Sequence, residues 1–420
     1  MSKYPSDWLS KPLGKVYPKI VVGYVGNVND HYCRAEEGVP FYRTLNIRDG
    51  YFRHSEHLYV THEFNEKNKK SQITNNDILI ARVGANLGMV CKANGISGLA
   101  NMANAIIIKT NDVNSADADF YTSFLLSPMG KNQIYSGAAG GAQGVFNTKL
   151  TQEIIVPVPP LPEQRKIAQI LSTWDRGIAT TEKLIDASKQ QKKALMQQLL
   201  TGKKRLIDPE TGKAFEGEWE TEQFDKLFDI EIGGTPARSN ETYWDDKLET
   251  NNNWLSIADL KGKFISRTKE RISDLGVAKS NVSLIPKGTI VMSFKLTIGR
   301  RAFLNIDTYT NEAICALLIK NKNKLDNNYL YQALEIVDFE QEIDQAVKGK
   351  TLNKAKLKRL KLLMPSVKEQ QKIASVLTDA DKEIELLEAK LVHFKQEKKA
   401  LMQQLLTGKR RVKVAETEAA

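Results

Sequence analysis

Basic and amide side chains recur in glycine-containing loops along this chain. The segments YRTLNIRDGYF, RVGANLG and GGAQGVFN in the first half, and GGTPARSN, FKLTIGRR and VKGKTLNK in the second, combine Arg, Lys, Asn or Gln with glycine. Arg can bind the two acceptors of guanine, Asn and Gln can pair with adenine, and Lys and Arg neutralise phosphates. These residue types therefore predict contact with a nucleic acid.

The candidate DNA-binding residues are the side chains in such loops that can read a base edge or neutralise a phosphate. They are Arg43, Arg48, Arg82, Asn86, Gln143, Asn147, Arg238, Lys261, Lys295, Arg300, Arg301, Lys350 and Asn353. Loops of this composition are common on any protein surface, so one of them alone would say little. The prediction depends on their presence at matching places in both halves of the chain.

The two halves are copies of one ancestral unit. The dodecapeptide KKALMQQLLTGK occurs at 192–203 and again at 398–409, 206 positions later. The same offset relates the Glu-Gln pair at 163–164 to the pair at 369–370, whereas an offset of 211 relates Trp8 to Trp219 and Gly88 to Gly299 nearer the start of each half. We therefore expect each half to hold a variable module followed by a nearly constant segment.

Each constant segment has the pattern of one long helix. Apolar residues follow steps of four and three, as at Ile167, Leu171 and Trp174, with proline-rich text before the segment and Thr-Gly after it. The apolar seam of such a helix must pack against a partner, and the nearest partner is the second helix of the same chain. We expect the two helices to pair in antiparallel orientation. The alternative is that each helix packs on its own module or on another protein. The basic residues after each Thr-Gly suit a helix C-terminus or a phosphate.

The variable modules have the pattern of mixed helix and sheet. Short apolar runs such as YPKIVVGYV, DILIARV, NAIIIK, TIVMSF and AICALLIK predict strands, and ADFYTSFLLSP and LDNNYLYQALE predict short helices. The expected fold class is α+β, with two globular domains joined by two long helices in an antiparallel intramolecular coiled coil with pseudo-twofold symmetry. The expected segments are 1–158 and 205–364 for the domains, and 159–204 and 365–420 for the helices with the basic tail.

Composition and charge narrow the class of protein. The net charge of +11 and pI near 9.2 are compatible with a polyanion partner, or with an ordinary basic protein. No apolar run approaches the roughly 20 residues that cross a membrane, and three scattered cysteines form no disulfide framework. We expect a cytoplasmic protein without a membrane partner.

Groupings typical of catalysis are missing from the sequence. It has no Walker A segment, no G-x-G-x-x-G that opens a βαβ unit, and no Asn-Pro-Pro-aromatic motif. The acidic stretch at 208–218 could suggest a nuclease but has the pattern of a polar linker. His31, His54, His57 and His62 lack the spacing of a zinc site. We expect a non-catalytic chain that binds no cofactor and no metal.

Taken together, the chain resembles the specificity (S, or HsdS) subunit of type I DNA restriction–modification enzymes. The resemblance covers nearly the whole sequence. It is carried by PLPEQRKIA at 160–168, KEQQKIA at 368–374, the two LLTG ends, the GGTP text at 233–236 and the loop around Gln143 and Asn147. Two differences stand out: Lys368 replaces the proline that would match Pro162, and the first module has no GGTP text.

The resemblance implies a concrete function. Each variable module would recognise one half of a split, asymmetric site on double-stranded DNA, and the paired helices would act as a spacer and as the dock for two methyltransferase (M) subunits. Restriction (R) subunits would join through them. S-adenosylmethionine would be bound by the methyltransferase partner, and ATP and Mg by the restriction partner. The alternative function is a coiled-coil scaffold with protein-binding globular ends.

Overall fold

In the computed structural model, the described residues are 4–111, 113–139, 145–339, 344–346 and 349–414. They form two compact units. One unit takes Met1–Lys183 and Ala389–Ala420, and the other takes Leu184–Glu388. Each unit therefore contains one variable module together with a part of both constant segments, so neither module folds against its own helix alone.

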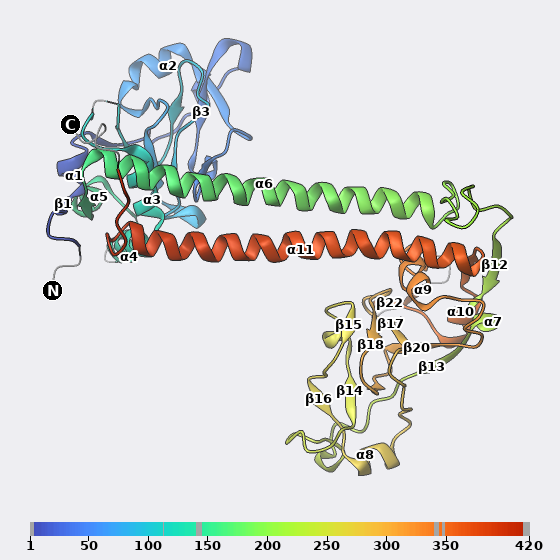
Figure 1. Ribbon diagram of the computed structural model, residues 1–420. Helices are drawn as coiled ribbons and strands as arrows, with labels where there is room; N and C mark the ends of the chain where they lie inside the picture. Colours follow the sequence, from blue (N-terminus) through green and yellow to red (C-terminus); the bar gives the residue numbers. More distant parts are fainter. Residues whose placement is uncertain (1–3, 112, 140–144, 340–343, 347–348, 415–420) are drawn as a thin grey trace. The chain divides into compact units, whose positions relative to one another are not determined.

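The two constant segments are single helices, as the heptad pattern predicts. Helix α6 spans Leu161–Leu199 and helix α11 spans Val367–Leu405, each 39 residues long and so about 58 Å at 1.5 Å per residue. Just beyond them, Gly202 and Gly408 adopt φ angles of +72° and +68°, the left-handed conformation that ends helices. Both helices pass from one unit into the other (Figure 1).

The first unit is built from short, mostly antiparallel sheets with helices beside them. The main sheet has the order β2-β10-β7-β8, a second has the order β6-β3-β9, and the pairs β1-β11 and β4-β5 complete it. The strands are β1 Leu9–Pro12, β2 Ile20–Val22, β3 Gly38–Tyr42, β4 Ile47–Arg48, β5 Tyr51–Phe52, β6 Leu58–Thr61, β7 Ile78–Ala81, β8 Val90–Lys92, β9 Asn101–Met102, β10 Ala105–Ile108 and β11 Ile155–Val158. The helices are α1 Leu13–Val16, α2 His62–Lys67, α3 Ala118–Leu126, α4 Pro128–Ala139 and α5 Thr148–Glu153.

The second unit repeats this plan with one more strand in its main sheet. Its main sheet has the order β13-β20-β17-β18-β15, and beside it lie β16-β14-β19, β12-β23 and β21-β22. The strands are β12 Glu220–Gln223, β13 Phe228–Ile232, β14 Asn253–Leu255, β15 Phe264–Ile265, β16 Glu270–Arg271, β17 Ile290–Ser293, β18 Arg301–Leu304, β19 Tyr309–Thr310, β20 Ile314–Ile319, β21 Asp344–Ala346, β22 Gly349–Thr351 and β23 Lys361–Met364. The helices are α7 Phe224–Leu227, α8 Asp274–Lys279, α9 Asn327–Ala333 and α10 Lys354–Arg359.

The core of each unit joins its module to both helices. In the first unit, Ile167 and Leu171 of α6 and Leu405 of α11 are buried in one cluster with Phe120 and Phe124 of α3. The second unit has the matching arrangement, with Leu199, Ile373 and Leu377 packed on aromatic residues of its module. Burial of each such side chain contributes about 1.5–3 kcal/mol, so the module and the helix pair stabilise one another.

The helices run antiparallel within each unit, as the sequence predicts. In the first unit, Lys395 pairs with Glu182 at 2.7 Å. In the second, Lys189 pairs with Glu388 at 2.6 Å. These two ion pairs occupy the same repeat positions, because both partners are shifted by the same 206 residues. The predicted α+β fold with two domains and a symmetric pair of antiparallel helices is therefore confirmed.

The predicted four-segment division of the chain stays a prediction, because each compact unit mixes module and helix. Within the described ranges, no helix combines the length and the apolar character that crossing a membrane requires.

Candidate nucleic-acid interface

A Trp-Glu-Arg contact fastens each module to the helix pair. In the first unit, the Trp8 indole donates to Glu163 at 3.1 Å, and Arg411 donates to both oxygens of that carboxylate at 2.7 and 2.8 Å. Asp7 accepts two further bonds from Arg411 at 2.9 and 2.8 Å. The hydrogen bonds with Glu163 and then Asp7 hold the pKa of Arg411 above its ordinary value.

The second unit repeats this contact. Trp219 donates to Glu369 at 3.1 Å, and Arg205 binds both carboxylate oxygens at 2.7 and 2.8 Å. The two acids are almost fully buried, with side chains 4% and 1% exposed. The basic residue that follows each long helix is therefore an anchor for the module packed on the start of the other helix.

The glutamine of each Glu-Gln motif fixes the neighbouring helix of the module. Gln164 accepts from the Asp117 amide, the N-cap of α3, at 2.9 Å and donates to the Pro159 carbonyl at 2.8 Å. Gln370 makes the matching bonds to Asp326 and Pro365 at 2.8 and 2.9 Å. The motif therefore sets the position of the module, from which its loops project.

The predicted residues of the first module form a partly connected group. Arg48 donates to the Asn86 side chain at 2.7 Å, and Asn86 donates to the Thr44 carbonyl at 3.3 Å, so the loop after β3 and the loop after β7 are tied together. Arg43 donates to the Glu56 carbonyl at 3.2 Å. Its Nε, like that of Arg82, is buried without a hydrogen-bond partner in the described part of the chain.

Arg238 of the second module is held on several sides. Its guanidinium lies 3.6 Å from the Trp244 ring centroid and 4.8 Å from that of Trp254, and it donates to both Glu270 oxygens at 2.5 and 3.1 Å. Trp254 in turn donates to the Gly234 carbonyl at 3.0 Å. Arg238 therefore stabilises the GGTP segment through Trp254, and it is also a candidate DNA contact.

The glycines of the GGTP segment are required by close packing. A Cβ atom on Gly233 would lie 2.0 Å from the Thr310 carbonyl oxygen, and one on Gly234 would lie 2.4 Å from the Asn281 side-chain oxygen. No larger residue fits there without a backbone shift. The motif is therefore explained by the fold of the second module.

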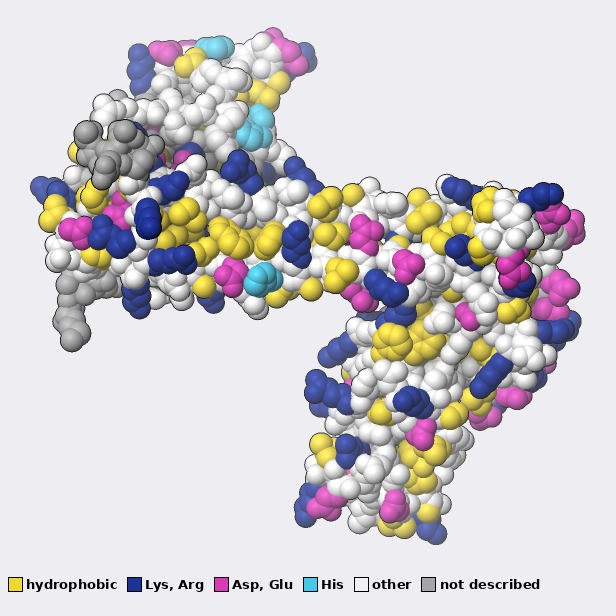
Figure 2. Space-filling model, viewed as in Figure 1, with side chains coloured by type: hydrophobic (Ala, Val, Ile, Leu, Met, Phe, Trp, Pro, Cys, Tyr) yellow, Lys and Arg dark blue, Asp and Glu magenta, His cyan; other side chains and the backbone are white. Residues whose placement is uncertain are grey.

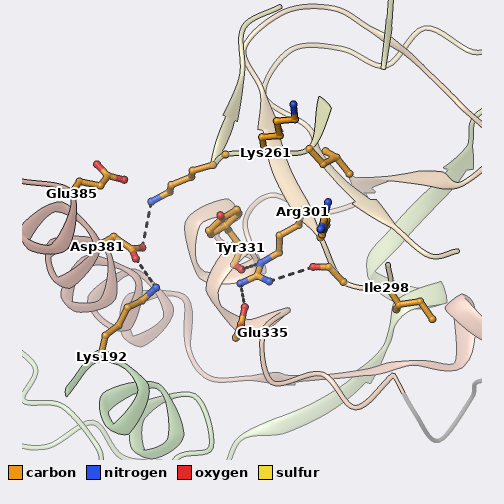
Figure 3. Close-up of a pocket in the computed structure, with 13 residues that line it drawn as sticks. Lys192, Lys261, Ile298, Arg301, Tyr331, Glu335, Asp381 and Glu385 are labelled. Carbon is orange, nitrogen blue, oxygen red and sulfur yellow. Dashed lines mark hydrogen bonds and ion pairs between the residues drawn. The ribbon is translucent and has the colours of Figure 1, made fainter. Parts of the chain in front are cut away.

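Lys261, Arg300 and Arg301 come together at one cleft. It has a volume of about 740 Å³ and lies between the helix pair and the β15–β18 part of the second module (Figure 3). Lys192 and Lys263, which sequence reasoning did not select, line the same cleft. Lys192 occupies a seam position of the first long helix, but so do the polar residues Thr181 and Ser188, so no signal in the sequence set it apart.

The remaining predicted residues lie elsewhere. Lys295 stands over the Phe294 ring at 5.4 Å in the loop after β17. Asn147 and Asn353 cap α5 and α10, each with its side-chain oxygen accepting a backbone amide at 3.0 and 2.9 Å. Gln143 lies outside the described residues, and of Lys350 the structure describes only its place in β22. All of these residues stay predictions as DNA contacts.

Two of the three cysteines are shut off from solvent. Cys91 and Cys315 are fully buried, and burial raises the pKa of each thiol to about 12, so neither forms a thiolate at neutral pH. Across the described ranges, no three side chains of His, Cys, Asp or Glu gather as a metal site would require.

The family description "Type I restriction modification DNA specificity domain" matches the chain twice, over residues 5–190 and 216–395. The chain belongs to this family of specificity subunits. The two matches correspond to the two copies of the internal repeat, so the resemblance predicted from sequence is confirmed. The function established at this level is DNA recognition in a type I restriction–modification system.

Two specificity subunits of one organism are similar to this chain over most of their length. The MjaVIII specificity subunit of Methanocaldococcus jannaschii is 25% identical over 390 residues, covering 89% of this chain and 86% of that protein. The putative MjaX specificity subunit of the same organism is 26% identical, covering 98% and 96%.

Solved structures share the fold of this specificity subunit. A chain from a study of complex assembly and conformational transition in a type I system gives a TM-score of 0.62 at 16% identity, covering 98% of this chain and all of that one. The S subunit from M. genitalium gives 0.58 at 14% identity, covering 95% and 96%. At such identities the likeness establishes the fold alone.

Proposed function

We propose that each module of this specificity subunit reads one half of a split, asymmetric DNA site. The observation that carries the proposal is the contrast within the repeat. The Trp-Glu-Arg anchors agree to within 0.1 Å in both copies, whereas the loops placed by those anchors carry different side chains. Two modules that are anchored in the same way but carry different loops are suited to recognise two different short base sequences.

The test is an exchange of one module. Residues 1–158 are replaced by the corresponding module of another specificity subunit, and methylated bases are mapped in cells that carry the assembled system. One block of the recognised sequence should change and the other should stay. A change in both blocks, or in neither, would contradict the proposal. An unmodified chain assembled in parallel controls for assembly.

We also propose that two methyltransferase subunits dock on the helices, one on each end of the pair. The dodecapeptide keeps identical residues even where side chains face solvent, as at Lys193 and Gln197 and their repeat mates Lys399 and Gln403. Folding does not require identity at exposed positions, so a shared partner is the physical reason for it. Leu386 and Val392 of the second long helix are exposed apolar side chains and add surface for such contact.

The remaining chemistry belongs to the partners in this proposal. S-adenosylmethionine is held by the methyltransferase subunits, which methylate adenine, and restriction subunits that use ATP and Mg join through them. The specificity subunit itself is non-catalytic and acts on double-stranded DNA in the cytoplasm. Binding of labelled S-adenosylmethionine by the purified chain alone would contradict this division of labour.

A further inference from the structure

The cleft of the second unit carries an excess of positive charge. Five cations line it, namely Lys192, Lys261, Lys263, Arg300 and Arg301, and they face three carboxylates, Glu335, Asp381 and Glu385. Two positive charges are therefore left over. Figure 2 shows Lys and Arg side chains on the face of the module that lies next to the helices. Such a concave, basic surface attracts anions.

Three of the cations are fixed in the wall of the cleft. Arg301 donates to the Tyr331 carbonyl at 2.5 Å and to Glu335 at 2.7 Å, and its guanidinium lies 4.8 Å from the Tyr331 ring centroid. Lys263 stands over the same ring at 5.3 Å. Lys192 and Lys263 share a single carboxylate, Asp381, at 2.5 and 3.8 Å (Figure 3). The wall is therefore ordered and incompletely neutralised.

The two other cations are free to bind a ligand. Lys261 and Arg300 are exposed, and neither has an ion-pair or side-chain hydrogen-bond partner in the described part of the chain. Both stand on loops, before β15 and between β17 and β18, and the second loop also carries the predicted DNA contact Lys295. If the bases of a DNA strand contact that loop, the phosphates of the same strand lie within reach of Arg300.

Most of this charge is absent from the first unit. The β7–β8 hairpin closes through a bond from Ala81 to the Met89 carbonyl, as the β17–β18 hairpin closes from Ser293 to that of Arg300. Met89 and Val90 therefore stand where Arg300 and Arg301 do. The matching capping boxes at 43–46 and 256–259 place Arg48 and Gly50 at the positions of Lys261 and Lys263. Two of the five positive charges are kept in the first unit: Lys398, which pairs with Asp175, and Arg48, which is half-buried and donates to the Asn86 side chain.

We propose that this cleft binds the phosphate backbone of one DNA strand, in the second unit only. Lys261 and Arg300 contact phosphates directly, while Lys192 and Lys263 supply charge from the wall. A residue of the constant helix thereby takes part in DNA binding beside one module and not beside the other. The inference rests on the proposed function, since it assigns a role to a surface next to the second recognition module.

The test measures how salt weakens DNA binding. The full chain, assembled with its methyltransferase subunits, is titrated with a random-sequence duplex at several salt concentrations. Each phosphate contact contributes about 0.9 to the slope of log K against log salt. We expect Lys261→Ala and Arg300→Ala each to reduce that slope by about one and to leave the mapped methylation sequence unchanged. Lys322→Ala, at an exposed lysine of the same unit, controls for net charge.

A second pair of variants separates the cleft from the helix. Lys192→Gln and Lys398→Gln remove the same dodecapeptide lysine and the same kind of ion pair between the helices. Because only the first faces the cleft, only Lys192→Gln should weaken DNA binding, several-fold at low salt. Their effects on unfolding should be alike, which separates loss of binding from loss of folding.

Several results would overturn the inference. They are an unchanged salt slope in Lys261→Ala and Arg300→Ala, equal effects of the two helix variants on DNA binding, or an altered methylation sequence, which would mean that the residues read bases. If the unmodified complex shows no sequence preference at all, the proposed function fails instead. Phosphate binding by the cleft is then tested only by the salt slopes of Lys261→Ala and Arg300→Ala.

Discussion

Glu163 and Glu369 are buried acids whose charge is matched by one arginine each. A buried carboxylate is stable only when it is paired and hydrogen-bonded. Each acid meets this condition with a bidentate guanidinium and a tryptophan indole. The Glu of the Glu-Gln motif is thus a structural residue, although its sequence context alone is compatible with a functional one.

Glu163→Gln and Glu369→Gln should both destabilise the protein, by about 1–3 kcal/mol, because the guanidinium loses its charged partner. The loss should be larger for Glu369→Gln. Its arginine is 23% exposed against 44% for Arg411, and Arg411 keeps Asp7 as a second partner. Urea denaturation of the two variants checks the order. Equal stability of both variants and the unmodified chain would contradict the anchor.

Asp7 gives the first anchor a pH dependence. Its hydrogen bond with Arg411 lowers the pKa of Asp7 below 3.8. A carboxyl with a lowered pKa stabilises the fold above its unfolded pKa, and loses that contribution as the pH falls through the folded value. Asp7→Asn should therefore lower the melting temperature equally at pH 7 and pH 5, with a difference that shrinks below pH 4. A difference that grows on acidification would contradict the contact.

Single residues are where sequence reasoning had least power. The composition of the loops selected Lys261, Arg300 and Arg301 one by one, whereas the cleft that they share also contains Lys192, which lies roughly 70 to 110 positions earlier in the chain. Asn147 and Asn353 carry the right chemistry for adenine and nevertheless cap helices. Composition identifies which groups can bind DNA, while only the tertiary fold shows which of them already have partners.

At the scale of elements, the long helices were predictable because their signals are local. Each segment has a heptad seam without proline, with proline before it and Thr-Gly after it, and this pattern predicts a single long helix. Gly177 falls inside the first long helix, and a Cβ atom there would lie 3.5 Å from the Phe394 ring, an ordinary van der Waals distance, so packing does not require glycine at this position. The Phe394 ring itself meets Trp174 edge to face at 5.5 Å. Strand order in the modules, in contrast, is set by contacts distant in sequence, and no local pattern predicts it.

The two helix ends offer a matched pair of substitutions. Gly202→Ala and Gly408→Ala each force alanine into a left-handed conformation, at a cost of about 1 kcal/mol. Gly408→Ala should cost more. Its Cβ would lie 2.4 Å from Cγ of Pro5, whereas that of Gly202 would lie 3.5 Å from the Trp219 ring. Thermal unfolding of both variants checks this order, and a larger loss for Gly202→Ala would contradict the packing at the second helix end.

At the scale of the whole molecule, the two copies of the repeat have diverged in their loops far more than in the residues that join each module to the helices. The residues that join module to helices stayed matched, as Trp8 with Trp219 and Gln164 with Gln370 show. The loops did not: Gly50, Met89 and Val90 of the first module stand where the cleft of the second has Lys263, Arg300 and Arg301. A chain of this kind can change one recognised sequence without changing its assembly, because the anchors and the exposed dodecapeptide faces do not depend on the loops.

The resemblance to specificity subunits implies that the helix pair is the spacer between the two DNA blocks, and a change in helix length tests this expectation. Residues 182–188 and 388–394 are repeat equivalents, so deleting both removes one heptad from each helix and preserves the facing register. The loss of about 10.5 Å of helix corresponds to about three base pairs. The mapped gap should shorten by that amount, with both blocks unchanged. Deleting only one of the two segments should instead misalign the seam and lower stability. An unchanged gap in a stable double deletion would show that another feature sets the spacing.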